Sequence, residues 1–355
     1  MKNTRLILLL SVAVLLASCD QKENFDDERP ETPVSGVPLQ IGSGISATVT
    51  RAFDTSWDAG NTIGVFTTKT GTTTITKSGT QYDENIPYST ATVYETYNSS
   101  THEYTYRPFT KLTEKQIYLP ADGSAVDVYA YYPYLNSVSA SVPLSISIPT
   151  TQTLDNQKGV DVLKAKVLST ESAPVDIDHP TQYLLFEHVM SKVIVYVMSG
   201  TGYSDDDLSG NKVSSVQLLG QPTAATYAPV SQELTITAGS NTITMQEVED
   251  TQDPDYASTY TIPSTSEVKN VLHVYRAIIL PNNTSTNPVT TGSERQIKFN
   301  VGSTNYTYDM TETFSPGAQT VFAMRLSATG LDVWAAIKDW SQETITPNPL
   351  YPQED

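Results

Sequence analysis

The sequence has very few of the residues from which catalytic and metal sites are commonly built. It contains one cysteine and four histidines among 355 residues, and the histidines show no His-x-His or His-Glu-x-x-His spacing that would hold zinc. It also lacks a glycine-rich phosphate loop before a helix and a Gly-x-Ser-x-Gly nucleophile elbow. A single cysteine excludes a disulfide within the chain, so packed strands or helices must provide the stability. We therefore expect no enzyme active site, no metal site and no cofactor.

Basic residues are also scarce. Lysine and arginine together number 21 against 39 acidic residues, which gives a formal net charge of −18. Nucleic acids and anionic lipid surfaces bind through positive patches. The charge balance therefore argues against both as partners.

The longest apolar run, Leu6–Leu16, is too short to span a bilayer as a helix. Together with Lys2 and Arg5 before it, this run is typical of a signal peptide over residues 1–18. It ends in "LASC", where a hydrophobic residue and two small residues precede Cys19, the only cysteine. This pattern resembles the lipobox of bacterial lipoproteins, in which the peptidase cuts before the cysteine and the cysteine then carries the lipid. The resemblance implies an outer membrane anchor on Cys19.

Residues 19–36 are charged, contain proline and have almost no apolar side chains, which is typical of a disordered tether. The segment "QKENFDDE" within them suits a solvated spacer. It also resembles the export tag of surface lipoproteins of the Bacteroidetes.

Strand patterns dominate from residue 37 onward. Tyrosine (21) far exceeds phenylalanine (8), as is typical of half-exposed sheets. Short alternating runs form two series of similar size on either side of a linker at 169–182, with one helical or irregular insertion expected at 154–167. We expect an all-β protein with two tandem β-sandwich domains, at 37–175 and 182–340, and a polar tail at 341–355.

One basic residue interrupts this pattern near the start. Arg51 is the only lysine or arginine between Arg29 and Lys69. The run before it alternates with a period of two, which predicts a half-buried strand. Its apolar odd positions are Val37, Leu39, Ile41, Ile45, Ala47 and Val49.

Three further features have a functional and a structural interpretation. His188 shares strand parity with Phe186, which favours a core or edge histidine over a catalytic one. The acidic segment at 203–210 favours a solvated loop over a calcium site. "AYYPY" at 130–134 favours cross-strand packing over a platform for stacking sugars. A glycosidase carboxylate pair is not singled out by any motif.

Several strings along the chain, behind the lipobox, resemble the fimbrillin family of the Bacteroidetes. In order they are "WDAGNTIGVF" (57–66), "VDVYAYYPY" (126–134), "DVLKAKV" (161–167), "LLFEHVMSKVIVYV" (184–197), "RAIILP" (276–281), "FSPGAQTVFAMRLSATGLDV" (314–333) and "AAIKDW" (335–340). The resemblance implies transthyretin-like sandwich domains and a role in the stalk, anchor or tip of type V pili. It also implies export as a surface lipoprotein and no enzymatic activity.

The resemblance further implies a maturation step. In fimbrillins, a protease cuts after an arginine near the start of the first domain, the first strand is lost, and a strand from another subunit fills its place. On this sequence the cut falls between Arg51 and Ala52, and the strand lost is residues 37–50. The partners would be other fimbrial subunits and, for an adhesin, a host or bacterial surface ligand.

The tail departs from the pattern of a stalk subunit, which is expected to donate a strand. Pro347, Pro349 and Pro352 interrupt it, and proline cannot donate to a strand ladder. Residues 331–337 alternate well, as either a donor or the last core strand would. The tip or an accessory position fits at least as well as the stalk. The competing interpretation is an uncleaved surface lipoprotein that binds glycans through its tyrosines.

Overall fold

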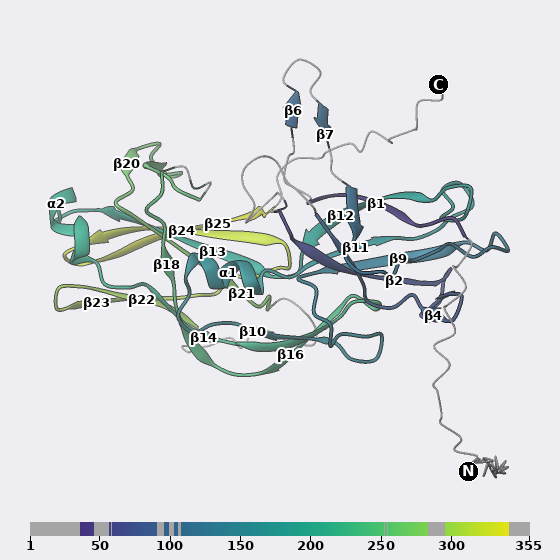
Figure 1. Ribbon diagram of the computed structural model, residues 1–355. Coiled ribbons are helices and arrows are strands. Elements are labelled where there is room, and N and C mark those ends of the chain that lie inside the picture. Colours follow the sequence, from purple (N-terminus) through teal and green to yellow (C-terminus); the bar gives the residue numbers. More distant parts are fainter. Residues whose placement is uncertain are drawn as a thin grey trace, which may run out of the picture. The chain divides into compact units, whose positions relative to one another are not determined.

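In the computed structural model, the described residues are 36–45, 57, 59–90, 96–98, 103–105, 108–251, 253, 255–282 and 295–340. Nearly all their regular structure is β-strand (Figure 1), so the expected all-β class is confirmed. The strands are rich in valine, isoleucine, threonine and tyrosine, which suit a pleated and partly buried surface. Cys19, where lipidation is expected, and Arg51 and Ala52, where cleavage is expected, lie outside the described part of the chain, as do Ala47 and Val49.

Seven strands form a closed barrel. In spatial order they are β1 (Gln40–Ile45), β12 (Thr181–His188), β11 (Leu163–Val167), β9 (Val126–Tyr132), β2 (Thr62–Lys69), β5 (Ile86–Ser89) and β8 (Pro108–Lys111). One apolar core fills the barrel, with Ile63, Val128 and Phe186 fully buried. Closure pairs the first strand on both sides, which leaves no open sheet edge there.

Three larger sheets contain most of the remaining strands. The five-stranded sheet has the order β18 (Gln246–Glu247), β21 (His273–Ile279), β13 (Ser191–Ser199), β24 (Ala318–Ser327), β25 (Gly330–Asp339). The four-stranded sheet has the order β17 (Asn241–Thr244), β14 (Gln217–Gln221), β22 (Gln296–Val301), β23 (Thr304–Asp309). The three-stranded sheet has the order β10 (Leu144–Ser147), β15 (Ala224–Ala228), β16 (Glu233–Ala238). Side chains from all three sheets, such as Val195, Leu218 and Tyr227, belong to one hydrophobic core.

The smaller elements are three two-stranded ribbons and three short helical turns. The ribbons pair β3 (Lys77–Ser78) with β4 (Gln81–Tyr82), β6 (Thr96–Asn98) with β7 (Glu103–Thr105), and β19 (Thr259–Thr261) with β20 (Val268–Asn270). The helical elements are α1 (Leu154–Val160), α2 (Asp205–Leu208) and a 3₁₀ turn, η1 (Gly210–Lys212). In the described residues, no helix is long and apolar enough to cross a membrane.

Strands on the two sides of the expected linker are interleaved. β12 begins at Thr181, yet it lies in the barrel between β1 and β11. Conversely, β10 precedes the linker but pairs with β15. The described residues from Gly36 onward belong to one compact unit. The division into domains at 37–175 and 182–340 stays a prediction.

The expectation of a helical or irregular insertion over 154–167 is correct only for its first half. Thr153 caps α1 through a capping box with Asn156. Residues 163–167 instead form β11, because Leu163 and Ala165 alternate with two lysines and fill the barrel core. Leucine, lysine and alanine are all good helix formers, so the composition of this run favoured a helix although its residues alternate.

Candidate functional site: the first strand of the barrel

The first strand closes the barrel between two partners of unequal extent. β1 runs parallel to β12 through six residue pairs, from Gln40 opposite Thr181 to Ile45 opposite Phe186. On its other side it is antiparallel to β8 through only two pairs, Ile41 with Phe109 and Gly42 with Pro108. The ladder to β12 therefore provides most of the backbone pairing of this strand (Figure 1).

Alternate side chains of this segment point into the barrel. Leu39 and Ile41 are each 1% exposed and Ser43 is 2% exposed, whereas Gln40 is exposed. This alternation agrees with the period of two in the sequence. Val37 is half-buried, and the side chain of Ile45 lies outside the description. The N-terminal segment thus contributes two large apolar side chains to the barrel core.

Backbone hydrogen bonds hold the segment where it enters the barrel. The Leu39 amide donates to the Ile117 carbonyl over 3.0 Å, and the Leu119 amide donates to the Val37 carbonyl over 2.9 Å. The Gln40 amide donates to the Pro180 carbonyl over 2.9 Å. The chain is therefore already fixed before β1 starts.

Trp57 links the two strands that flank β1. Its ring meets Phe109 of β8 edge-on at 5.2 Å between centroids and Phe186 of β12 at 5.0 Å. Tyr132 of β9 completes this aromatic group at 5.4 Å. Sequence reasoning gave Trp57 no role, although a lone tryptophan in the polar stretch "DTSWDAGN" was a visible signal. It lies six residues after Arg51, on the part of the chain that cleavage would retain.

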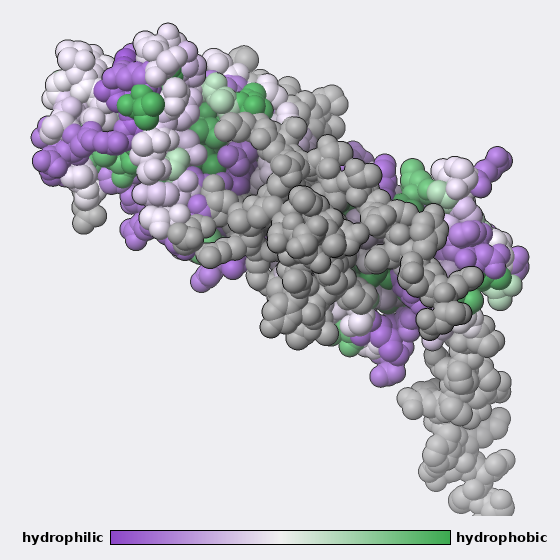
Figure 2. All heavy atoms as spheres, turned by 90° about the horizontal axis from the view of Figure 1, so that it is seen from above, coloured by the Kyte–Doolittle hydropathy of each residue, from purple (hydrophilic) through white to green (hydrophobic). Residues whose placement is uncertain are grey.

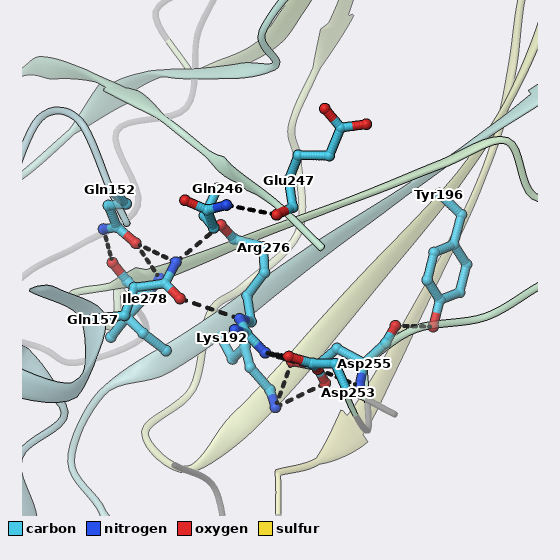
Figure 3. Close-up of polar contacts among 10 residues, drawn as sticks. All are labelled: Gln152, Gln157, Lys192, Tyr196, Gln246, Glu247, Asp253, Asp255, Arg276 and Ile278. Carbon is cyan, nitrogen blue, oxygen red and sulfur yellow. Dashed lines mark hydrogen bonds and ion pairs between the residues drawn. The ribbon is translucent and has the colours of Figure 1, made fainter. Parts of the chain in front are cut away.

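A cluster of charged side chains lies at the five-stranded sheet (Figure 3). Like Trp57, it was not predicted from the sequence. The Lys192 ammonium lies 3.0 Å from Asp255 Oδ1, and Arg276 Nη1 lies 2.9 Å from Asp255 Oδ2 and 3.0 Å from Asp253. Lys192 and Arg276 are 2% and 1% exposed. The only sequence signal was a single charge inside each of two apolar strands, "MSKVIV" and "VYRAII".

Amide side chains extend this group to α1. Gln157 Oε1 accepts from Arg276 Nε over 3.1 Å, and Gln157 Nε2 donates to Gln152 Oε1 over 3.0 Å. Gln152 pairs with both backbone groups of Ile278, at 2.6 and 2.8 Å (Figure 3). Two cations face two carboxylates, and every member is hydrogen-bonded, so the group joins α1, β13 and β21 as a structural link.

His188 is a core residue, as its strand parity indicates. It is 3% exposed, its Nδ1 lies 2.8 Å from Asp161 Oδ1, and its ring stacks on Trp340 at 3.9 Å. The Lys192 ammonium lies 5.0 Å from the centre of the same tryptophan. Trp340 therefore fixes the end of β25 against the barrel strand β12.

The tyrosines at 131, 132 and 134 do not share one exposed face. Tyr131 is fully buried, with its hydroxyl 2.9 Å from Asn85 Oδ1. Tyr132 packs against Trp57 and accepts a hydrogen bond from Asn61 Nδ2 over 3.2 Å. A flat platform for stacking sugars is therefore not formed by this strand.

Carboxylates of the acidic segment at 203–210 already accept hydrogen bonds from neighbouring residues. Asp205 accepts from the Ser199 hydroxyl and from Asn270 Nδ2, and these bonds lower the pKa of Asp205. Asp207 accepts from the backbone amide and the hydroxyl of Ser204, which lowers its pKa too. Across the described residues, no group of three or more histidine, cysteine or acidic side chains is placed to hold a metal ion.

On one face of the molecule, the described residues form no large apolar patch. On the face drawn in Figure 2, hydrophobic residues appear as small separate groups among hydrophilic ones. Scattered apolar residues of this kind are normal on a protein surface.

Comparison with known proteins agrees with this architecture. A sequence model of the fimbrillin-like family matches residues 50–340. A protein of Bacteroides uniformis, provisionally named fimbrium subunit Fim1C, is 28% identical over 348 residues, which are 96% of each chain. The chain belongs to the fimbrillin-like family, whose members are structural proteins of fimbriae and adhesion rather than enzymes.

Two solved structures share the fold. Both are described provisionally as cell adhesion proteins, one from Bacteroides uniformis and one from Bacteroides ovatus. The first has a TM-score of 0.58 at 22% identity and covers 86% of this chain and 98% of its own. The second has a TM-score of 0.59 at 17% identity and covers 87% of this chain and all of its own. The recognition of the family from the sequence strings is confirmed.

Proposed function

We propose that this protein is a structural subunit of a type V fimbria that serves adhesion at the cell surface. In this proposal it is exported behind the signal peptide at 1–18 and is anchored in the outer membrane by a lipid on Cys19. Residues 19–36 form the tether, and the later strands make two transthyretin-like sandwich domains. Cleavage after Arg51 then releases the chain into the fimbrium, where it joins other subunits by strand exchange and meets its surface ligand.

The position of β1 is the observation that supports this proposal most. Among the described strands, β1 comes first in the chain and closes the barrel, so a single cut after it separates it from all the others. Its removal would leave unpaired backbone groups on β12 and β8, together with a furrow where Leu39 and Ile41 were. A strand from another subunit restores both the hydrogen bonds and the apolar contacts.

The last strand supports a tip or accessory position over the stalk. β25 pairs with β24 through ten residue pairs, from Gly330 opposite Ser327 to Asp339 opposite Ala318. Trp340 directly after it is buried against His188. Residues 331–337 are thus part of the five-stranded sheet, so donating them would dismantle a paired strand.

Limited proteolysis tests the proposed maturation. We expect trypsin, acting on the folded full chain, to give a new N-terminus at Ala52, identified by N-terminal sequencing. An Arg51→Gln variant should stay uncut there and keep the same circular dichroism spectrum. An intact wild-type product, or cutting only at Arg29 or Lys69, would contradict the proposal.

Strand exchange needs its own measurement. After the cut, a synthetic peptide with the sequence of residues 37–50 should replace the bound N-terminal fragment when it is added in excess. Mass spectrometry under native conditions measures the replacement. A cut chain that keeps its original fragment, and takes up no peptide after long incubation, would argue for cleavage without exchange.

A further inference from the structure

β1 has an unusual composition for a barrel strand that is paired on both sides. Its sequence is QIGSGI, so Gly42, Ser43 and Gly44 occupy its centre. Glycine weakens a strand because it loses more conformational freedom on folding and offers no side chain to pack. By contrast, β9 directs Val126, Val128 and Ala130 into the same core. The centre of β1 therefore contributes little apolar contact.

The buried side chain at the centre of β1, Ser43, also has a hydroxyl whose hydrogen-bonding capacity is not satisfied. Ser43 is 2% exposed and faces inward after Leu39 and Ile41. Its hydroxyl has no hydrogen-bond partner among the described residues. A hydroxyl that loses water without gaining a partner opposes burial. Ser43 therefore weakens the hold of the barrel on its own first strand.

The outer face of β1, which alternates with the face bearing Ile41 and Ser43, does not require glycine at its centre. A Cβ atom added to Gly42 would lie 3.4 Å from Tyr183 Cδ2, which is an ordinary van der Waals contact. Gly42 also has no positive φ that would exclude a side chain. On this outer face, the neighbouring strand β12 thus does not impose glycine at position 42.

We infer that Ser43 weakens the hold of the barrel on β1, and that the residue at position 43 of an incoming strand determines which strand replaces β1. This inference rests on the proposed function. The preferred replacement is a strand of another fimbrial subunit that runs parallel to β12 and antiparallel to β8. It places an apolar side chain where Ser43 lies, and so leaves no unpaired hydroxyl in the core.

The first experiment measures β1 in the full chain and does not depend on cleavage. Amide hydrogen exchange compares the wild type with Ser43→Ala, which removes the hydroxyl without adding volume. We expect the amides of β1 to exchange about tenfold more slowly in the variant, as about 1.4 kcal/mol of relief would give. Exchange in β13 should be unchanged.

Thr320→Val is the matched control. Thr320 is 1% exposed on β24 of the five-stranded sheet, and its hydroxyl also has no partner in the described residues. Removing the Thr320 hydroxyl should leave the amides of β1 exchanging at the wild-type rate. Equal slowing by both variants, or no slowing by Ser43→Ala, would overturn the inference.

The second experiment measures the choice of strand. The cut full chain, with both pieces retained, is offered labelled peptides of residues 37–50 that differ only at position 43, as serine, alanine, valine or aspartate. Fluorescence anisotropy should give the alanine or valine peptide about tenfold tighter binding than the serine peptide, and the aspartate peptide the weakest.

The outcomes separate the two proposals. Equal binding by the serine, alanine and valine peptides would overturn the role of position 43 and leave strand exchange standing. No binding by any peptide would count against strand exchange, and the hydrogen-exchange result would then decide alone whether Ser43 weakens β1.

Discussion

The ammonium group of Lys192 lies 3.0 Å from Oδ1 of Asp255, and the two side chains are only 2% and 4% exposed. Arg276 Nη1 lies 2.9 Å from the other oxygen of the same carboxylate. Each of these buried charges is compensated in part by the others. The charges therefore make this part of the fold sensitive to the loss of any one of them.

We expect Lys192→Met to lower the free energy of unfolding by about 3 kcal/mol, because it leaves the buried carboxylate of Asp255 and the partly buried one of Asp253 to share Arg276. Urea denaturation followed by circular dichroism measures the loss. Lys269→Met is the matched control, since its ammonium lies 3.0 Å from Glu267 with both side chains partly exposed. It should lose less than about 1 kcal/mol. Equal losses in the two variants would show that burial of the first pair is unimportant.

A second prediction concerns the contribution of Trp57 to the stability of the barrel. Trp57→Ala removes a buried ring that contacts Phe109 and Phe186, the residues on either side of β1. We expect it to cost about 3–5 kcal/mol of unfolding free energy. In proteolysis under native conditions, the variant should also be cleaved within β8 or β12, where the wild type resists cleavage.

Trp334 offers the comparison within the same chain. It lies half-buried on the edge strand β25, with the Arg325 guanidinium 5.2 Å from its ring. Trp334→Ala should cost less than half as much, because part of its ring already faces solvent. A barrel that tolerates Trp57→Ala as well as the sheet tolerates Trp334→Ala would contradict the role given to Trp57.

The sequence was informative where the pattern is local. A period of two around residues 37–49 was enough to place Leu39 and Ile41 on the inner face of a strand, because alternate residues of a strand face opposite sides. It could not indicate that β1 pairs with β12, about 140 residues later. Such pairing depends on how the whole chain closes, which no local pattern records.

The same limit explains the polar group around Arg276. Gln157, Lys192 and Asp255 come from a helix, a strand and a loop, and only the folded chain brings them to Arg276. Isolated charges inside apolar strands were a usable signal, since an unpaired buried charge is strongly disfavoured. The partners of Lys192 and Arg276 could not be identified from the sequence, because acidic residues are plentiful throughout the chain.

His273 gives a pH-dependent prediction. Its Nδ1 lies 2.6 Å from Glu247 Oε1, and its Nε2 lies 2.7 Å from the Leu208 carbonyl. Burial lowers the pKa of His273, but the hydrogen bonds to Glu247 and Leu208 outweigh it and raise the pKa above the ordinary 6.5. The charged form is thus favoured in the folded state. Its contribution to stability is fully present below pH 6.5 and is lost as the pH rises through the folded pKa.

We therefore expect His273→Gln to cost about 1–2 kcal/mol of unfolding free energy near pH 5.5 and clearly less near pH 8.5. Urea titrations of both proteins across this range give the difference curve. His179→Gln is the control, because His179 also contacts a carboxylate, Asp176 at 2.9 Å, but its side chain is 56% exposed. Near pH 5.5, the control should lose much less stability than His273→Gln, because solvent screens the exposed pair. A His273→Gln difference that grows with pH would mean that the neutral imidazole is the form this site stabilises.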